Sequence, residues 1–323
     1  MGYSTNQRAM FALLVAGSTA VVYAMLDAEV ADGWVVLYAA LLPIVFRMLI
    51  VASPQAEPGR IWQSVQVLGA MRRREIVLHY QPKVDVVSGE AIGVEALARW
   101  KHPRRGLLAP GDWLHATETR WLQWRFCCYV LREAIAQTAR WRAEGRDFVV
   151  CVNVAPSAFV NRSLPRAIAR LLDEHGLPPT YLCVELTEEA LDTSDRSTRV
   201  ADQLTELGVI LALDDFVVGH SSMDRLVGLP INELKIDRRF VSRMVNSDRN
   251  GAVVRAAVGL GHSLGMVVVA EGVESPEIMR SLEALGCDIA QGFLFSPALP
   301  SDELERWLGG DRAARFVRAV RAG

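Results

Sequence analysis

Eight short apolar runs alternate with amphipathic helical stretches over most of the 323-residue chain, and this alternation predicts an α/β fold with a largely parallel sheet. Eight runs in about 250 residues favour a (β/α)8 TIM-like barrel. Only eight residues, 83–90, separate the first two runs, which is too short for a crossover helix, so one strand should be antiparallel. An open, doubly wound sheet is the alternative. The runs are 76–82, 91–97, 148–154, 181–187, 209–215, 232–237, 266–272 and 287–293.

Two uncharged apolar stretches at the N-terminus predict a transmembrane helical hairpin over residues 1–52. The first covers 9–26, and the second covers 33–46 and resumes after Arg47. A spanning helix needs about 20 apolar residues, and Arg47 lies close enough to the far end to reach the interface. Arginines flank both outer ends of the pair. We therefore expect the hairpin in the inner (cytoplasmic) membrane, lipid as a partner, and the barrel in the cytoplasm.

Three alternatives to the hairpin stay open. The first stretch could be a cleaved signal peptide. The second could be a buried helix of a soluble domain. Both could lie in the membrane interface, although neither has a charged face, which makes this arrangement less favourable.

The rest of the chain divides into a connecting segment, 53–71, and a barrel domain, 72–323. Residues 53–60 are polar and contain two prolines, and 61–71 read as a helix leading into the barrel. Between the apolar runs, four helical stretches end in glycine, as helices often do. These stretches are 129–145, 164–176, 198–208 and 278–286.

The composition excludes several classes of protein. Hydrophobic residues make up 51% of the chain, and 35 basic against 37 acidic residues give a net charge of −2, so the chain is not disordered. This balance leaves no basic footprint for a nucleic acid duplex. The five cysteines form no C-x-x-C pair, so no zinc site is indicated. Cys151 and Cys183 lie inside apolar runs and are expected to be small core residues.

Most of the apolar runs end on an oxygen-bearing or charged side chain. Because the carboxyl ends of barrel strands form the active face, we expect these side chains to converge on one mouth. Buried carboxylates without partners repel one another and take up protons, so hard cations are the expected counter-charges. Oxygen ligands without His or Cys clusters favour Mg²⁺ or Mn²⁺ over Zn²⁺. The strand-end residues are Glu95, Asn153, Glu185, Asp214, Lys235, Asp237, Glu271 and Gln291.

The adjacent pair Asp214 and Asp215 favours a site for two cations, since one carboxylate could bridge both ions. Two cations about 3.5–4 Å apart are typical of phosphoester hydrolysis. Each residue also has a plainer interpretation. A single strand-end carboxylate can be solvated, Lys235 could only neutralise the acidic mouth, and Arg99 could be a salt-bridge partner.

A series of motifs in order resembles the EAL-domain family of cyclic di-GMP phosphodiesterases, from about residue 75 to 308. The signature Glu-Ala-Leu lies at 95–97. The resemblance implies a barrel with one antiparallel strand, and hydrolysis of one phosphodiester of cyclic di-GMP to linear pGpG with Mg²⁺ or Mn²⁺. The other motifs are YQP at 80–82, WKHPRRGLLAP at 100–110, VNVAPSAF at 152–159, ELTE at 185–188, DDF at 214–216, LKID at 234–237, AEGVE at 270–274 and QGF at 291–293.

The resemblance also assigns roles to individual residues. Asp214 would bridge two cations, with Asp215 beside it. Lys235 and Glu271 would orient and deprotonate the attacking water, and Glu188 would hold the loop after Asp215. The remaining cation ligands would be Glu95, Asn153 and Glu185. Gln81 and Arg99 would contact the dinucleotide, and Gln291 would line the site.

The loop after Asp215 departs from the family pattern, Phe-Gly-Thr-Gly-Tyr-Ser-Ser. Val217 and Val218 replace a Gly and a Thr, and His220 replaces a Tyr. A β-branched residue reaches positive φ only with strain. If the family loop needs that conformation to support cation binding and the catalytic dimer, it must rearrange here.

Three functions follow from these observations. The leading hypothesis is a membrane-anchored cyclic di-GMP phosphodiesterase that forms a homodimer through its barrel, and the presence of Lys235 and Glu271 favours it. The second is a weak or inactive receptor that binds cyclic di-GMP and signals through protein partners, which Val217 and Val218 favour. The third, a Mg²⁺-dependent barrel enzyme with another substrate such as a lyase, explains fewer of the motifs.

Overall fold

The computed structural model describes residues 58–117, 119–190, 195–216 and 226–309. The chain divides into two units, Met1–Leu68 and Gly69–Gly323. Helix α3 (Pro58–Arg72) spans the boundary between them and matches the helix expected over 61–71. The division of the chain at residues 52 and 71 stays a prediction.

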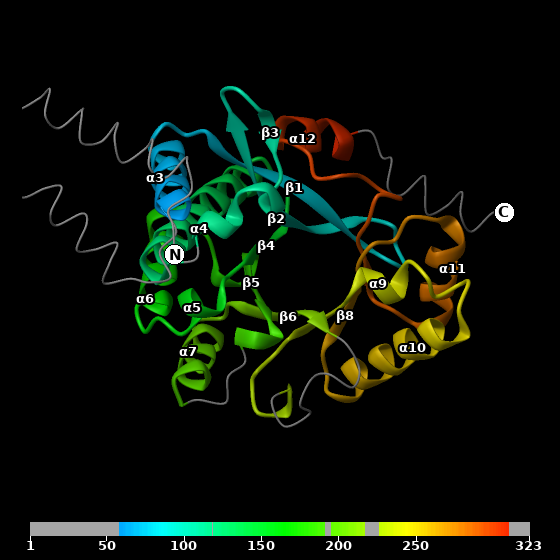
Figure 1. The fold of residues 1–323 in the computed structure, drawn as a ribbon. Coiled ribbons are helices and arrows are strands. Elements are labelled where there is room, and N and C mark those ends of the chain that lie inside the picture. Colours follow the sequence, from blue (N-terminus) through cyan, green and yellow to red (C-terminus); the bar gives the residue numbers. More distant parts are fainter. Residues whose placement is uncertain (1–57, 118, 191–194, 217–225, 310–323) are drawn as a thin grey trace, which may run out of the picture. The chain divides into compact units, whose positions relative to one another are not determined.

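The described strands form one sheet that closes into an eight-stranded barrel with a ninth strand outside it (Figure 1). Strand β1 (Ile76–Asp85) pairs antiparallel with both of its barrel neighbours, β2 (Ala91–His102) and β9 (Ile289–Ala290). The closure excludes an open, doubly wound sheet. From β2 to β9 the neighbours pair in parallel through β4 (Val149–Asn153), β5 (Leu182–Thr187), β6 (Ile210–Phe216), β7 (Glu233–Ile236) and β8 (Val267–Ala270).

Each predicted apolar run contains one barrel strand, because these strands are buried on both faces. All four residues of β7 are buried, as are five of the six in β5. The expectation of one antiparallel barrel strand is confirmed by β1. The short strand β3 (Gly106–Leu108) was not anticipated; it pairs with the end of β2, and three residues carry too little pattern to be recognised.

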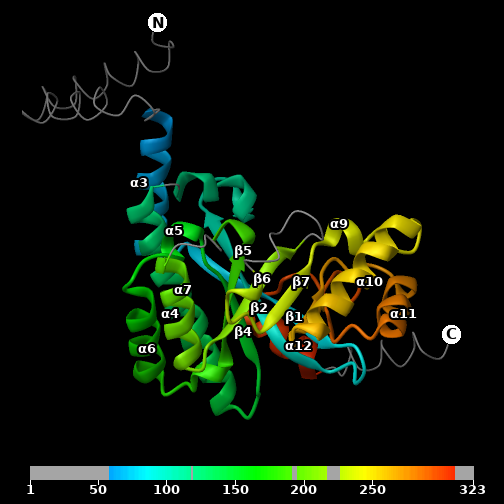
Figure 2. The same ribbon diagram turned by 90° about the horizontal axis from the view of Figure 1, so that it is seen from below.

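Helices follow the strands and cover the outside of the barrel (Figures 1 and 2). In both views α4 to α7 lie beside one part of the barrel wall and α9 to α11 lie beside the opposite part. The four stretches that end in glycine are confirmed as parts of α4, α6, α7 and α11. The bounds are α4 (Arg120–Ala143), α5 (Pro156–Phe159), α6 (Leu164–His175), α7 (Asp195–Glu206), α9 (Arg238–Val241), α10 (Asp248–Ser263), α11 (Pro276–Leu285) and α12 (Ser301–Gly309).

Trp141 of α4 joins a barrel strand to two helices of the outer layer. Its ring is fully buried and packs edge-on against Tyr80 and Phe148, with centroid distances of 4.8 and 6.0 Å. Its Nε1 donates a hydrogen bond of 2.8 Å to Glu305 Oε1. The aromatic contacts and the hydrogen bond therefore tie α4 to β1 and to α12.

Some expectations concern residues outside the described part of the chain. The hairpin over 1–52 lies there, and so do Val217, Val218 and His220. Within the described ranges, no helix is both long enough and apolar enough to cross a membrane.

Gly292, directly after β9, lies where a side chain has no room. A Cβ atom there would lie 2.1 Å from the carbonyl oxygen of Val273 and 2.3 Å from its amide nitrogen. Val273 N donates to Gln291 O, and Leu294 N donates to Val273 O, each at 3.0 Å. This close approach holds the segment after β8 against the segment after β9.

We predict that Gly292→Ala lowers the free energy of unfolding by about 1–3 kcal/mol, because the two backbones must separate. Gly259→Ala in α10 is the control, since a Cβ there meets nothing within 4 Å. It should be neutral or stabilise by up to about 1 kcal/mol. Urea unfolding of both variants measures the difference, and equal stabilities would contradict the packing constraint.

Candidate active site

Polar side chains from all eight barrel strands, or from the residues directly after them, gather at one mouth. Seven come from the carboxyl ends of parallel strands, and Gln81 joins them because antiparallel β1 pairs it with Glu95. The set is Gln81 (β1), Glu95 (β2), Asn153 (β4), Glu185 (β5), Asp214 (β6), Lys235 (β7), Glu271 (after β8) and Gln291 (after β9).

Lys235 lies at the centre of this group, with its side chain fully buried. Its Nζ lies 2.7 Å from Glu271 Oε1 and 2.9 Å from Glu185 Oε2. Asp214 Oδ1 is 3.1 Å away and Glu95 Oε2 is 4.0 Å away. Burial lowers the pKa of Lys235, but these carboxylates, with Glu185 and Glu271 first, raise it well above its ordinary value. The ammonium group therefore stays charged inside the barrel.

Two amide side chains hold the Glu95 carboxylate. Asn153 Nδ2 donates to Glu95 Oε1 at 2.7 Å, and Gln291 Nε2 donates to Glu95 Oε2 at 2.6 Å. Gln291 Nε2 also donates to Gln81 Oε1 at 3.1 Å, and Gln81 Nε2 donates to the Ser296 carbonyl oxygen at 3.1 Å. The hydrogen bonds fix the orientation of the carboxylate before any ligand binds.

The pair Asp214 and Asp215 forms a strained end of β6. Asp215 has a φ of 54°, in the left-handed region where a residue other than glycine is under strain. Its amide donates to Asp214 Oδ1 at 2.9 Å. One oxygen from each of Asp214, Asp215 and Glu271 lies within 4.8 Å of the others. The backbone at the end of β6 therefore places the Asp215 carboxylate beside those of Asp214 and Glu271.

The carboxylates of the mouth titrate differently because their surroundings differ. Burial raises the pKa of Glu271 to about 7, with Lys235 opposing the rise and Asp214 adding to it. Burial also raises the pKa of Glu185 well above its ordinary value. Burial would raise the pKa of Glu95 too, but Lys235 and the two amide donors outweigh it and hold that pKa below its ordinary value.

The donor set fits divalent cations. One ammonium group faces five carboxyl groups, so four negative charges have no counter-charge when all five are ionised. Two divalent cations would supply four positive charges and would favour the ionised forms of Glu185 and Glu271, whose pKa values burial raises. The Oε1 atom of Glu185 is buried and has no hydrogen-bond partner among the described residues, which is costly for a carboxylate oxygen. Hard cations such as Mg²⁺ and Mn²⁺ take oxygen ligands of this kind. The five carboxyl groups belong to Glu95, Glu185, Asp214, Asp215 and Glu271.

Three residues singled out from the sequence make no direct contact with Lys235 among the described residues, although Asp237 lies near enough to help raise the pKa of Asp215. Arg99 lies farther along β2, where its Nη1 donates to the Ala98 carbonyl oxygen at 2.9 Å. Glu188 begins the 3-10 helix η4 (Glu188–Ala190) after β5, and the loop it is expected to hold lies outside the described residues. Asp237 caps α9 by accepting from Arg239 N at 2.8 Å.

Sequence reasoning missed two contributors to the mouth. Gly292 allows the close approach beside Gln291, and the Ser296 carbonyl oxygen accepts from Gln81. Neither contributes a side-chain functional group, so no chemical signal marks them in the sequence.

The fold and the mouth define a TIM-like barrel with an acidic centre, and comparison with known proteins assigns the family. The family model described as EAL domain matches residues 64–298. This chain belongs to the EAL domain family.

Curated relatives and solved structures agree with this assignment. The chain is 40% identical over 237 residues to the bifunctional diguanylate cyclase/cyclic di-GMP phosphodiesterase MucR of Pseudomonas aeruginosa. This match covers 73% of the present chain and 35% of MucR. It is 36% identical over 257 residues to the cyclic di-GMP phosphodiesterase RocR of the same organism, covering 79% of this chain and 66% of RocR. The chain therefore spans about a third of the length of MucR and about two thirds of RocR.

Two solved structures have a similar fold. One is described as the PaMucR phosphodiesterase in a c-di-GMP complex; its TM-score is 0.72 at 39% identity, and the match covers 75% of this chain and 99% of that one. Another is the EAL enzyme Bd1971 in a form bound to cAMP and cyclic di-GMP, with a TM-score of 0.74 at 26% identity. That match covers 88% of this chain and 78% of the Bd1971 chain.

We predict that, without divalent cations, raising the pH from about 5 to 8 destabilises the folded chain. The pKa of Glu271 is about 7 when folded and about 4.3 when unfolded, so the folded state holds this proton more tightly. That stabilisation is complete below about pH 4 and is lost as the pH rises through about 7. Thermal unfolding in a chelator at a series of pH values measures it.

Glu271→Gln should flatten this pH dependence, whereas Glu277→Gln, at an exposed position on α11, should leave it unchanged. Mn²⁺ should raise the Tm more at about pH 8 than at about pH 5.5, because burial raises the pKa of Glu185, an expected ligand, and protons compete with the cation for its carboxylate. A Tm that does not change with pH in the chelator would contradict the raised pKa.

Proposed function

We propose that this chain is a membrane-anchored cyclic di-GMP phosphodiesterase that hydrolyses its substrate to linear pGpG with two cations, Mg²⁺ or Mn²⁺. The observation that carries the proposal is the convergence of five carboxylates, Asn153 and Lys235 at one mouth of the barrel. The printed names of RocR and of the PaMucR complex, a cyclic di-GMP phosphodiesterase and a phosphodiesterase with c-di-GMP, support the choice of substrate.

The acidic side chains would place the cations between the barrel and the substrate. Their ligands would be Glu95, Asn153, Glu185, Asp214 and Asp215. Cations bound there would polarise the phosphodiester and lower the pKa of water. The hydrogen bonds from Asn153 and Gln291 keep the Glu95 carboxylate oriented, so little reorganisation accompanies binding.

Glu271 would accept the proton of the attacking water. Its pKa of about 7 suits a base that works near neutral pH. The Lys235 ammonium, 2.7 Å from Glu271 Oε1, would hold this carboxylate in place and help to orient the water. Glu188 would support the loop after Asp215.

Three side chains would bind the dinucleotide. Gln81 and Gln291 present amide groups at the mouth, and Gln291 Oε1 is buried without a hydrogen-bond partner among the described residues. Arg99 lies on β2, four residues beyond Glu95, where its guanidinium group would contact a phosphate.

The direct test incubates the full-length protein, purified in detergent, with cyclic di-GMP and Mn²⁺. We expect pGpG, and a loss of turnover of about 100-fold or more for Glu95→Ala, because displacing a bound cation by about 1 Å costs that much. Glu277→Gln is the matched control and should keep full turnover. Turnover by Glu95→Ala equal to that of the unchanged protein would contradict the assignment of the mouth.

The receptor is the second candidate, and the substitutions Val217, Val218 and His220 favour it. Binding of cyclic di-GMP without pGpG formation would support the receptor and contradict the enzyme. Absence of both binding and turnover would contradict both functions.

The membrane anchor has its own test. We propose that residues 1–52 hold the protein in the inner membrane, with the barrel in the cytoplasm and a homodimer formed through it. Detergent should be required for extraction, and light scattering on the extracted protein should give twice the protomer mass. Extraction by high salt alone would contradict the anchor.

A further inference from the structure

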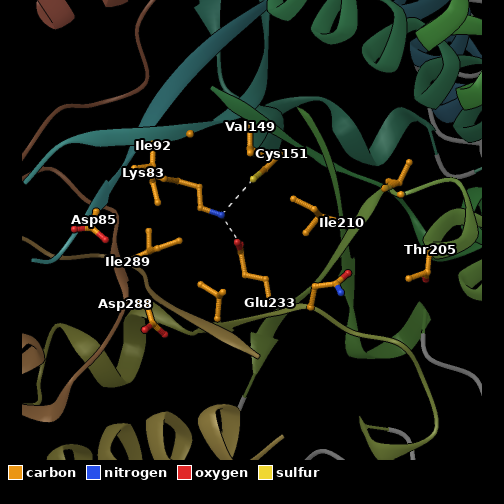
Figure 3. A pocket seen from close by; sticks show the side chains of 15 residues that line it. Lys83, Asp85, Ile92, Val149, Cys151, Thr205, Ile210, Glu233, Asp288 and Ile289 are labelled. Carbon is orange, nitrogen blue, oxygen red and sulfur yellow. Dashed lines mark hydrogen bonds and ion pairs between the residues drawn. The ribbon is translucent and has the colours of Figure 1, made fainter. Parts of the chain in front are cut away.

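A pocket of about 550 Å³ opens at the end of the barrel opposite the candidate active site (Figure 3). Val149, Ile210 and Glu233, which line it, are the first residues of β4, β6 and β7, and Asp85 is the last residue of antiparallel β1. The mouth described above lies at the carboxyl ends of the same parallel strands. The pocket is therefore separate from the cation-binding mouth.

A buried polar cluster lies at the inner wall of this pocket. Lys83 Nζ donates to Cys151 Sγ at 3.2 Å and forms an ion pair with Glu233. Figure 3 shows the two contacts meeting at the lysine nitrogen, with Cys151 among the lining residues. Cys151 is only 1% exposed, so a molecule must be small to reach its sulfur through the pocket.

A second thiol lies directly beside Cys151. Cys151 and Cys183 are opposite each other in the parallel pairing of β4 and β5, and both are fully buried free thiols. Their sulfur atoms and a Glu233 oxygen lie within 4.8 Å of one another. Neighbouring strands are about 4.8 Å apart, and disulfides join Cα atoms about 4.4–6.8 Å apart. The two thiols can therefore bond without a change of strand register.

The same cluster is poorly suited to a metal ion. The Lys83 ammonium contacts Cys151 and Glu233, so a positive charge already lies among the three candidate ligands. A metal would have to displace this ammonium and leave it buried without a partner, which is strongly unfavourable. The reaction that suits this cluster is therefore oxidation of its two thiols.

We propose that Cys151 and Cys183 are a modification site for hydrogen peroxide and form a reversible disulfide at the base of the barrel. Peroxide is only slightly larger than water and fits the pocket. The Cys151 sulfur attacks one peroxide oxygen, the O–O bond breaks, and sulfenic acid and one water form. The Cys183 sulfur then attacks the sulfenic sulfur, the S–S bond forms, and a second water leaves. The two sulfurs together lose two electrons and two protons, and peroxide is reduced to two waters.

Lys83 assists the first step by its position. Its ammonium group is in contact with the Cys151 sulfur, so it lies beside the peroxide oxygen that leaves with negative charge. An ammonium group there stabilises the developing charge as a hydrogen-bond donor. Cys287 is also buried, but it lies outside this cluster, and its hydrogen bonds to described residues go to the carbonyl oxygens of Val268 and Ile289.

The disulfide would act on the mouth through the strands themselves. Cys151 and Cys183 lie two residues before Asn153 and Glu185, which are likewise opposite each other in register. Residues two apart point to the same face of a strand, so the new bond would lie one step beneath this pair of proposed ligands. This consequence rests on the proposed function, whereas formation of the disulfide does not.

The modification is tested on the reduced full-length protein treated with hydrogen peroxide, followed by peptide mapping without reductant. We expect a cross-linked peptide pair containing Cys151 and Cys183, with the loss of two hydrogen atoms, restored by a thiol reductant. Cys183→Ser should abolish the cross-link and leave a sulfenic acid on Cys151, which dimedone traps when it is added together with denaturant, because Cys151 is buried in the folded chain. Cys128→Ser, which removes a more exposed cysteine of α4, should leave the cross-link unchanged.

Oxidation of Cys128 or Cys287 with no cross-link between Cys151 and Cys183 would overturn the proposal. Cys151→Ser, with thermal unfolding as a check of folding, is a second variant that should remove both the cross-link and the dimedone adduct. A dimedone adduct that persists on another cysteine in this variant would assign the reactive thiol elsewhere.

The effect on the mouth is measured as turnover of cyclic di-GMP before and after oxidation. We expect a fall of several-fold, up to about 100-fold for a shift of about 1 Å, reversed by reductant and absent in Cys183→Ser. Cross-linking with unchanged turnover would overturn the coupling. No turnover by the reduced protein would contradict the proposed function, while the mapping result would still decide the disulfide.

Discussion

The acidic mouth depends on the ion pairs that the buried ammonium group of Lys235 forms with the surrounding carboxylates. Carboxylates that share a low-dielectric site repel one another, and this one positive charge lies within 4.0 Å of four of them. When these carboxyl groups ionise, one ammonium group cannot balance them all, so the surroundings of Lys235 are where further positive charge is needed. The arrangement of the acidic side chains at the mouth thus depends on one basic residue.

A second buried ion pair, between Lys83 and Glu233, lies at the other end of the barrel. Glu233 and Lys235 lie two residues apart on β7, so both point into the barrel at neighbouring levels. Glu233 pairs with Lys83 beneath, and Lys235 pairs with the carboxylates above. Glu233 and Lys235 each have a partner of opposite sign at their own level, which is the condition under which charges are tolerated inside a protein.

The strands of the barrel and most residues of its mouth could be predicted from the sequence, because both follow from short-range patterns. Apolar runs mark the strands, and the polar residue that ends each run is delivered to the mouth by strand polarity alone. The Lys83–Glu233 pair joins residues 150 positions apart, and nothing local indicates that they meet. Gly292 and the Ser296 carbonyl oxygen act through backbone position, and the positive φ of Asp215 comes from how β6 ends, so none of these could be anticipated from residue type.

The reversed direction of β1 also determines where the chain enters the barrel. Ile76 pairs with Trp100, beyond Glu95, whereas Asp85 reaches the base. In an all-parallel barrel the first strand would begin at the base, far from the chemistry. Here the first strand begins beside the mouth and carries Gln81 only five residues later. Ile76 and Gln81 therefore lie on one continuous strand that pairs with β2 at both positions, so the point where the chain enters the barrel and an amide of the mouth belong to one hydrogen-bonded unit.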